Sequence, residues 1–255
     1  MIGSLLLGRY VFGTFYLILT VLCVREFYML LKKSGASPDA EAGFLNVIFI
    51  YILFALIVSQ YGPLTHKLIL LLTITIGGIM VQELFKKSVR PFVNIGYTLI
   101  GIIFISLPFV FFHALAYIGG EFNFHYPLAF LLLLWASDTG AYLVGRRFGK
   151  TKLFERHSPK KTWEGFIGGI VISALVAFVI SYFFKELQWN QWVSISILVS
   201  CFGTLGDLAE SMFKRSINVK DSGEILPGHG GLLDRFDGLL LAAPIVYTYL
   251  YFITN

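Results

Sequence analysis

Five acidic residues in the C-terminal half of the chain lie inside apolar stretches or at their ends: Asp138, Asp207, Glu210, Asp234 and Asp237. An ionisable group inside a membrane span costs about 2.5 to 3.5 kcal/mol, so each needs a structural partner or a function. Asp207, Glu210 and Lys214 have the spacing of one helical face. Asp234 and Asp237 have the spacing of another. Two acidic faces from different helices can bind Mg²⁺, with water and substrate phosphates completing its coordination.

A structural interpretation of these acids is also open. Asp207, Asp234 and Asp237 could pair with Arg215 and Arg235 and so hold helices together without any role in chemistry. The residues that connect the two acidic faces bear on this choice.

That connection is basic and rich in glycine. Its four cations are Lys214, Arg215, Lys220 and Arg235. Gly228, Gly230 and Gly231 let backbone N–H groups approach an anion before a helix N-terminus, which also favours negative charge. Phosphoryl or nucleotidyl transfer needs such cations and carboxylates, because its catalysis depends on positioning and charge neutralisation. Taken alone, the glycines fit a tight turn equally well, and His229 fits a loop histidine bonded to backbone.

The stretch 211–237 resembles the signature of the CDP-diacylglycerol synthases, or phosphatidate cytidylyltransferases. The matching positions are Ser211, Lys214, Arg215, Lys220, Asp221, Ser222, Leu226, Pro227, His229, Gly230, Gly231, Asp234, Arg235, Phe236 and Asp237. The segment 158–165 resembles the family's other polar segment, and the similarity is strongest from Asp138 to the C-terminus. The chain departs from the family at its start, where Arg9 follows a very short lead instead of a basic stub and a fuller first helix.

The resemblance implies that CTP and phosphatidic acid react to give CDP-diacylglycerol and pyrophosphate, in phospholipid biosynthesis. It implies Mg²⁺ on the residues Asp207 and Asp234, with Asp237 close by and with room for a second cation. It also implies a homodimer.

Charge and position suggest the finer roles within this resemblance. The expected catalytic residues are Asp207, Lys214, Arg215, Asp234, Arg235 and Asp237, whose bases suit phosphate contacts. The expected substrate-binding residues are Ser158, Lys160, Lys161, Ser211, Lys220, Asp221, His229, Gly230, Gly231 and Asp138. Among these, Lys220 and His229 suit CTP or pyrophosphate.

Two of these assignments have structural alternatives. Pro159 predicts an extended entry to a helix that begins at Trp163, so the bases of this segment could simply orient the protein in the membrane. As ligands, Lys160 and Lys161 would attract anionic phosphatidate or the triphosphate, at about 1 kcal/mol per basic residue for surface lipid attraction. Asp138 could likewise be neutralised by Arg146 or Arg147.

The elements that must position these residues follow from composition. Of the 255 residues, 56% are apolar and 14% are charged, and the mean hydropathy is +0.76. This excludes a soluble globular protein, a disordered chain and a disulfide-stapled module, since Cys23 and Cys201 both lie in apolar runs. A net charge of +5 could favour binding to nucleic acid, but the sequence has no separate basic domain for it, so we expect no nucleic-acid partner. The N-terminus lacks the pattern of a removable signal peptide.

The expected fold is an all-α polytopic integral membrane protein in a lipid bilayer. Apolar runs predict eight spans, or nine if Pro108 divides the fourth. These runs are 4–31, 44–60, 67–85, 92–118, 127–145, 163–184, 191–213 and 232–253. The glycine pairs 77–78 and 168–169 are interpreted as close helix-packing points.

The bases predict the orientation of these spans. Fifteen of the twenty basic residues lie in alternate connections, which puts both termini outside and the polar site on the cytoplasmic face of the cell membrane. We expect a single membrane domain over 1–255. Within it, 1–126 would be a scaffold that could mediate dimerisation, and 127–255 would hold the catalytic helices with cytoplasmic loops 146–162 and 214–231.

Two other functions fit parts of the pattern. A CTP-dependent lipid kinase would attack the γ-phosphorus and release CDP instead of pyrophosphate. An ion-coupled transporter could use intramembrane acids as an ion path. The absence of visible inverted repeats and the crowding of polar residues at one side count against the transporter.

Overall fold

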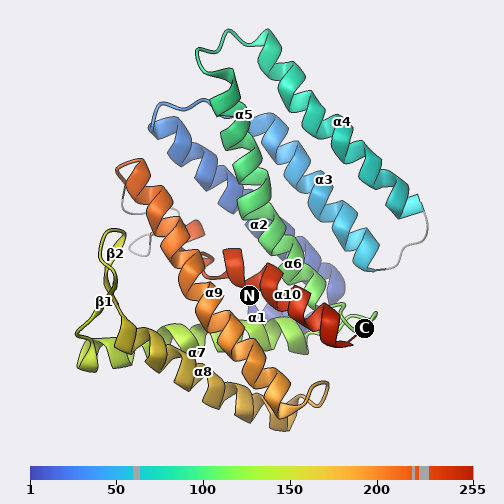
Figure 1. Cartoon of the computed structure of the whole chain (residues 1–255). Helices are drawn as coiled ribbons and strands as arrows, with labels where there is room; N and C mark the ends of the chain where they lie inside the picture. The colour runs from blue at the N-terminus through green and yellow to red at the C-terminus, as the bar shows by residue number, and fades with distance from the viewer. Residues whose placement is uncertain (60–63, 220–221, 224–229, 255) are drawn as a thin grey trace. The chain divides into compact units, whose positions relative to one another are not determined.

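A computed structural model describes residues 1–59, 64–219, 222–223 and 230–254 (Figure 1). Apart from the first two residues, the chain forms two compact units. The first unit comprises 3–122 together with 221–235, and the second comprises 123–220 together with 236–255. Each unit is described by itself. The predictions for Lys220, Asp221 and His229 lie outside the described residues.

The first unit is a set of helices with an aromatic core. Its elements are α1 (Ile2–Leu6), α2 (Arg9–Lys33), α3 (Ala40–Val58), α4 (Leu64–Phe85), α5 (Pro91–Ile100), a π-helix (Gly101–Ser106), α6 (Leu107–Leu115) and a 3₁₀ turn (Leu233–Arg235). Phe12, Tyr16 and Phe112 are fully buried where α2 meets α6. Gly8, with φ of 98°, separates α1 from α2, so the first predicted span begins at Arg9 instead of residue 4.

Pro108 does not divide the fourth span. The segment Pro91–Leu115 is one helical run of 25 residues, and the π-helical turn directly precedes this proline. A proline inside a helix removes one backbone donor and crowds the preceding turn, and a widened π turn is a common way to accommodate such a disruption.

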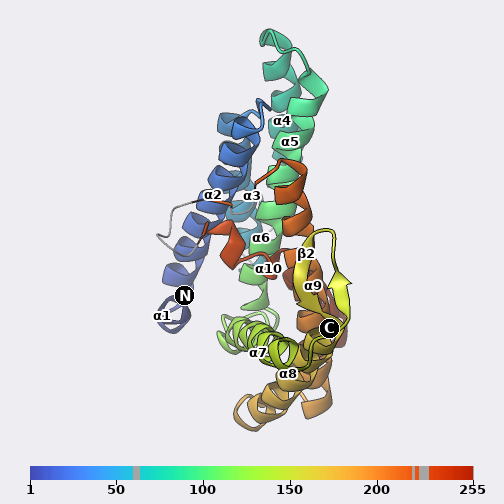
Figure 2. The ribbon, with the colours of Figure 1, turned by 90° about the vertical axis from the view of Figure 1, so that its left-hand side faces the viewer.

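The second unit is built from four helices and a β-hairpin. Its elements are α7 (His125–Phe148), β1 (Lys152–Phe154), β2 (Ser158–Thr162), α8 (Trp163–Phe183), α9 (Trp189–Ser216) and α10 (Leu239–Thr254). The strands pair antiparallel, with Lys152 opposite Thr162. Figure 2 shows this hairpin standing off the α7–α8 pair. The hairpin confirms the extended entry to the helix at Trp163.

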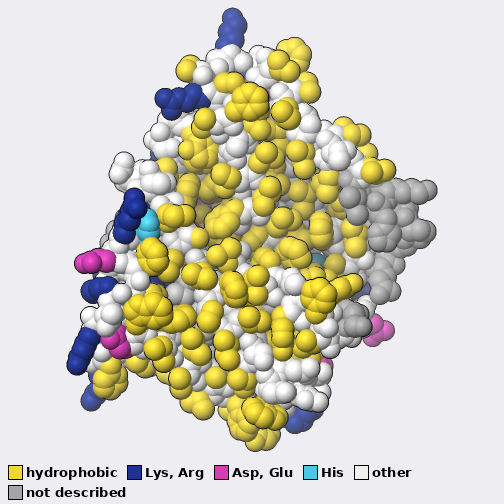
Figure 3. All heavy atoms as spheres, viewed as in Figure 1, with side chains coloured by type: hydrophobic (Ala, Val, Ile, Leu, Met, Phe, Trp, Pro, Cys, Tyr) yellow, Lys and Arg dark blue, Asp and Glu magenta, His cyan; other side chains and the backbone are white. Residues whose placement is uncertain are grey.

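The structure confirms an all-α membrane fold. Among the described residues, six helices are long and apolar enough to cross a membrane, and two shorter apolar segments are Leu70–Phe85, which belongs to α4, and Leu239–Thr254, which is α10. Together they occupy the eight predicted positions. Large apolar side chains such as Leu70, Phe183 and Phe252 are exposed, and in Figure 3 such side chains cover much of one face while charged ones lie at its margins. Such a surface fits contact with lipid.

The eighth predicted span needs a correction. The helix begins at Leu239, because residues 236–238 form a turn after the 3₁₀ turn. Asp234 and Asp237 therefore do not share the face of an α-helix, as their spacing predicted. Their carboxylates precede the apolar helix, where the backbone is shaped by turns.

Glycines set the close packing of α7 against α8. A Cβ added at Gly168 would lie 2.5 Å from the Val144 side chain, and one at Gly169 would lie 2.8 Å from the Ser137 carbonyl oxygen. The pair at 168–169 is thus a close packing point, as predicted. By contrast, a Cβ at Gly77 or Gly78 would meet no described atom within 4 Å, so this pair is not a packing point among the residues that the structure describes.

We expect Gly168→Ala to lower the free energy of unfolding by about 1 to 3 kcal/mol, because the added methyl group overpacks the helix contact. Thermal unfolding of the purified protein in detergent measures the effect. Gly96→Ala is the matched control, since its Cβ would have open space and alanine favours the helix by up to about 1 kcal/mol. Equal melting temperatures for the two variants would contradict the packing role of Gly168.

Candidate active site

An acidic and a basic side chain from distant parts of the sequence meet in the second unit. Lys161 Nζ lies 2.5 Å from Asp207 Oδ2. Ser211, one turn further along α9, donates a hydrogen bond to Asp207 Oδ1 at 3.3 Å. The structure thus brings together three residues that the sequence assigned to the site. Asp207 pairs with the hairpin lysine, while Arg215 donates to the Val219 carbonyl oxygen.

The β-hairpin places the lysines. Thr162 caps α8 by accepting a hydrogen bond from the Gly165 N–H at 3.2 Å. The Glu164 carboxylate accepts from the N–H groups of Lys150 and Thr151, and this ties the base of the hairpin to the start of α8. A lysine at the end of β2 is therefore held beside the helices instead of extending freely into solvent.

A cavity of about 390 Å³ lies beside the ion pair. Its charged lining residues are Asp138, Arg146, Lys160, Lys161 and Asp207. Leu153, Ala141 and Phe166 add apolar walls. This lining combines charged groups that suit an anionic headgroup with apolar side chains that suit hydrocarbon. It brings Asp138 to the site, while Arg146 donates to the Tyr142 hydroxyl and Arg147 lies over the Phe148 ring.

Asp237 lies close to Asp207 because α9 has glycine where the two segments meet. A Cβ at Gly206 would lie only 2.4 Å from the Asp237 carbonyl oxygen. Burial, and then the neighbouring Asp207 carboxylate, raise the pKa of Asp237, whose Oδ1 accepts a hydrogen bond from the Gly238 N–H. Two adjacent carboxylates repel each other, and a divalent cation between them would relieve this repulsion.

These acids fit a metal that is bound largely through water and substrate. Among the described residues, no group of three or more His, Cys, Asp and Glu side chains forms a metal site by itself. Mg²⁺ characteristically uses one or two protein carboxylates together with phosphate oxygens. Asp207 and Asp237 can supply that minimum.

Other predicted residues have different surroundings. Lys214 is buried, and its Nζ lies 2.7 Å from Glu210 Oε2, so this base is paired within α9. Arg215 and Arg235 are exposed. Ser158 begins β2 and is not among the residues that line the cavity.

The first unit holds Asp234 in a separate cluster. Asp234 Oδ2 accepts hydrogen bonds from the N–H groups of Ser222 at 2.9 Å and Gly231 at 2.8 Å. Gly230 has φ of 78°, a left-handed conformation that favours glycine. A Cβ at Gly231 would overlap the Ser222 hydroxyl and the Glu26 carboxylate. Gly231 therefore leaves room for these side chains, while the expected approach of glycine N–H groups to a phosphate stays a prediction, and Gly228 lies outside the described residues.

Glu26 is the residue of this cluster that sequence analysis missed. It lies on α2 with 2% of its surface exposed. Its Oε2 accepts a hydrogen bond from Ser222 Oγ at 3.1 Å and another from the Leu233 N–H at 2.7 Å. The signal was present, because Glu26 is an acid inside the first apolar run and carries the same insertion cost as the five acids that were noted.

Comparison with known proteins identifies the family of this chain. Residues 1–253 match the model of a family described as the cytidylyltransferase family. The chain is 35% identical over 245 residues to a Staphylococcus aureus (strain COL) protein named phosphatidate cytidylyltransferase, covering 95% of this chain and 90% of that protein. A Staphylococcus haemolyticus protein of the same name is 43% identical over 163 residues, covering 63% of this chain and 61% of that protein.

Proposed function

Because this chain belongs to the cytidylyltransferase family, we propose that it is a membrane enzyme that converts CTP and phosphatidic acid to CDP-diacylglycerol and pyrophosphate. The family match confirms the resemblance drawn from residues 211–237. The structural observation that carries the proposal is the cavity that combines Lys160, Lys161, Asp138 and Asp207 with apolar walls. A phospholipid monoester has the same combination of anionic headgroup and hydrocarbon.

The reaction needs no protein nucleophile. An ionised phosphate oxygen of phosphatidate attacks the α-phosphorus of CTP and forms the new P–O bond. The bond from the α-phosphorus to its bridging oxygen breaks, and pyrophosphate leaves with that electron pair. The protein's task is to position two anions against each other and offset their repulsion.

The charged side chains assigned to the site suit this task. Lys160 and Lys161 attract the phosphatidate headgroup, while the apolar wall favours the first part of its acyl chains. Asp207 and Asp237, with Asp234 added by the family resemblance, would hold Mg²⁺. When bound, this ion neutralises charge on the transferring phosphoryl group and on pyrophosphate. A second cation, the further phosphate contacts of Lys214, Arg215 and Arg235, and the CTP contacts of Lys220 and His229 are parts of the same proposal.

Topology and assembly complete the proposal. The distribution of basic residues favours a cell-membrane enzyme whose site faces the cytoplasm, where a water-soluble nucleotide is available. The resemblance favours a homodimer, with the N-terminal helices as scaffold. Accessibility labelling of the variants Lys152→Cys and Glu186→Cys in intact cells tests the orientation, since one position precedes α8 and the other follows it.

Product analysis tests the reaction directly. Purified protein is supplied with CTP, phosphatidic acid and Mg²⁺, and both the lipid product and the released phosphate compound are identified. We expect CDP-diacylglycerol and pyrophosphate in equal amounts. Release of CDP with a phosphorylated lipid would identify a CTP-dependent kinase instead, and absence of any turnover would leave the transporter hypothesis.

We expect the double substitution Lys160→Ala and Lys161→Ala to raise the KM for phosphatidic acid about ten- to thirtyfold. Two bases at about 1 kcal/mol each account for that range. Steady-state kinetics with phosphatidic acid in mixed micelles measures the effect. Lys152→Ala is the matched control, because Lys152 lies on the same hairpin, is exposed and does not line the cavity. Unchanged KM values for both substrates would leave the lysines with only an orienting role.

A further inference from the structure

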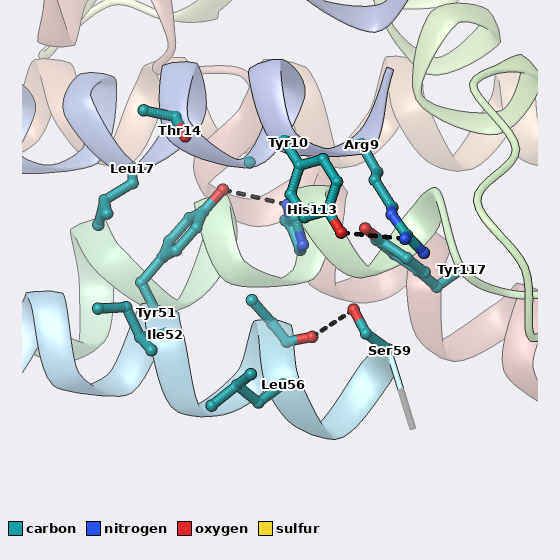
Figure 4. Close-up of a pocket in the computed structure, with 12 residues that line it drawn as sticks. Arg9, Tyr10, Thr14, Leu17, Tyr51, Ile52, Leu56, Ser59, His113 and Tyr117 are labelled. Atoms are coloured by element: carbon teal, nitrogen blue, oxygen red, sulfur yellow. Dashed lines mark hydrogen bonds between the residues drawn. The ribbon is translucent and has the colours of Figure 1, made fainter. Parts of the chain in front are cut away.

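The first unit contains a second cavity, which lies at the N-terminal end of α2. It has a volume of about 270 Å³ and is an open pocket lined by the start of α2, the end of α3, and the end of α6 with the segment after it (Figure 4). The described part of α2 continues for 25 residues to Lys33, a length of about 37 Å. Glu26 and its loop contacts lie near the far end of this helix, so the cavity is remote from them.

A buried histidine supplies the polar centre of this cavity. His113 is 4% exposed, and its ring stacks on Phe12 with 5.3 Å between ring centroids. The Tyr51 hydroxyl lies 3.2 Å from His113 Nδ1. Within the described part of the chain, the buried Nε2 has no hydrogen-bond partner. A buried polar atom without a partner is costly, and a ligand that hydrogen-bonds to it would remove that cost.

The tyrosine contact is compatible with a tautomer that suits an anion. In the tautomer protonated on Nε2, the Tyr51 hydroxyl donates to Nδ1 and Nε2 is the donor that an anionic ligand would use. Gly13 allows this ring position, since a Cβ there would lie 3.2 Å from His113 Cε1. Figure 4 shows His113 and Tyr117 from α6 and the segment after it, and Tyr51 from α3, facing the space below the start of α2.

The charge at the cavity is positive. Arg9 is exposed at the first position of α2, and its guanidinium lies 4.8 Å from the centre of the Tyr10 ring. The described residues that line the cavity include no Asp or Glu, while Leu17, Ile52 and Leu56 give it apolar walls. A base and aromatic hydroxyl groups above hydrocarbon are typical of the level at which a bilayer meets water.

We propose that this cavity binds the headgroup of an acidic phospholipid, with the phosphate near Arg9 and His113 Nε2 and one acyl chain along the apolar wall. The lipid belongs to the leaflet at the N-terminal end of α2. It is a different lipid from the phosphatidate of the reaction, for whose headgroup we propose Lys160 and Lys161 of the second unit. The ligand must be anionic to use Arg9 and must carry hydrocarbon to use the leucines and isoleucine.

Native mass spectrometry of the purified protein tests this site without CTP. The probes are dioleoyl phosphatidylglycerol and dioleoyl phosphatidylcholine at equal concentrations. We expect about fivefold preferential retention of phosphatidylglycerol, the equivalent of about 1 kcal/mol for one basic residue. Arg9→Gln and His113→Phe should each remove most of that preference.

Two further variants keep the test decisive. Ala55→Phe adds bulk to the cavity from α3 and leaves Arg9 and His113 in the sequence, so it should also reduce retention even if His113→Phe fails to fold. Arg90→Gln is the control, because Arg90 is an exposed base of the same unit that does not line the cavity. Equal retention of the two lipids, or a preference that survives in Arg9→Gln and Ala55→Phe, would overturn the proposal.

The cavity could instead bind a free anion such as inorganic phosphate, and a competition experiment distinguishes this from binding of a lipid. Excess inorganic phosphate should leave the retained phosphatidylglycerol unchanged, because phosphate cannot use the apolar wall. Displacement of the lipid by phosphate would identify a free-anion site and make the lipid proposal wrong. Neither probe lipid is a substrate of the proposed reaction, so failure here and failure of the cytidylyltransferase assay are distinguishable.

Discussion

Asp207→Asn is expected to lower kcat by about 10²- to 10³-fold, the range seen when one preorganised electrostatic contact to a transition state is removed. The substitution keeps the shape of the side chain and removes the charge that both Lys161 and the proposed Mg²⁺ require. Activity is measured over a range of Mg²⁺ concentrations in protein with an unchanged melting temperature. We also expect the Mg²⁺ concentration for half-maximal activity to rise.

The comparison with Lys161 separates two roles of Asp207. If the carboxylate served only to pair with the lysine, Lys161→Gln would cause the same loss as Asp207→Asn. If Asp207 holds the metal, Lys161→Gln should raise the KM for lipid and leave the Mg²⁺ requirement nearly unchanged. Glu155→Gln, at an exposed position in the hairpin turn, controls for loss of one negative charge. Substantial Mg²⁺-dependent turnover by Asp207→Asn would refute the metal assignment.

Glu26→Ala is expected to lower kcat about 10- to 100-fold, because the segment that contains Asp234 would lose the hydrogen bonds that hold it in place. The substitution removes the acceptor for Ser222 Oγ and the Leu233 N–H, and a hydrogen bond to a charged group contributes about 1.5 to 3 kcal/mol. A small displacement of catalytic groups can cost about 10²-fold in rate. Glu26 touches no substrate in this account, so it is a positioning residue.

Conservative variants and the metal requirement test this role. Glu26→Gln keeps an oxygen acceptor and the length of the side chain, and it should therefore retain more activity than Glu26→Ala. Glu41→Ala, at an exposed position on α3, is the control for removal of an acid. We expect Glu26→Ala to need more Mg²⁺ for half-maximal activity. A lower melting temperature with unchanged kcat and Mg²⁺ requirement would reduce Glu26 to a purely structural role.

Helix positions were predictable because the helices are long apolar runs bounded by polar residues. The run 163–184 and the helix Trp163–Phe183 agree within one residue at each end. The hairpin before this helix was not predicted, since 152–162 is short and basic and has no alternating apolar pattern. The helical pairing of Asp234 with Asp237 was wrong because spacing alone cannot show that the chain turns at 236–238 before the helix begins.

Side-chain partners were predictable only in part. Charge suggested that Asp207 would pair with a base, but Arg215, which is close in sequence, was the wrong partner. The observed partner, Lys161, is brought to Asp207 by a hairpin and by the packing of α7, α8 and α9. Glycines at 140, 165, 168 and 169 permit that packing. Glu26 and Ser222, far apart in sequence, meet for a comparable reason, since glycine at 231 leaves room for the contact.

The sequence by itself determined the class of fold, the family and the kind of chemistry. The length of an apolar run can be compared directly with the thickness of a bilayer, so membrane spans can be predicted from sequence. A motif with many fixed positions in a short stretch can be recognised without a three-dimensional structure. Only the tertiary structure decided that Lys161 neutralises Asp207, that Gly206 brings Asp237 beside it, and that Glu26 holds the segment before Asp234. These contacts join residues separated by tens to hundreds of positions, and their existence depends on how closely the helices approach.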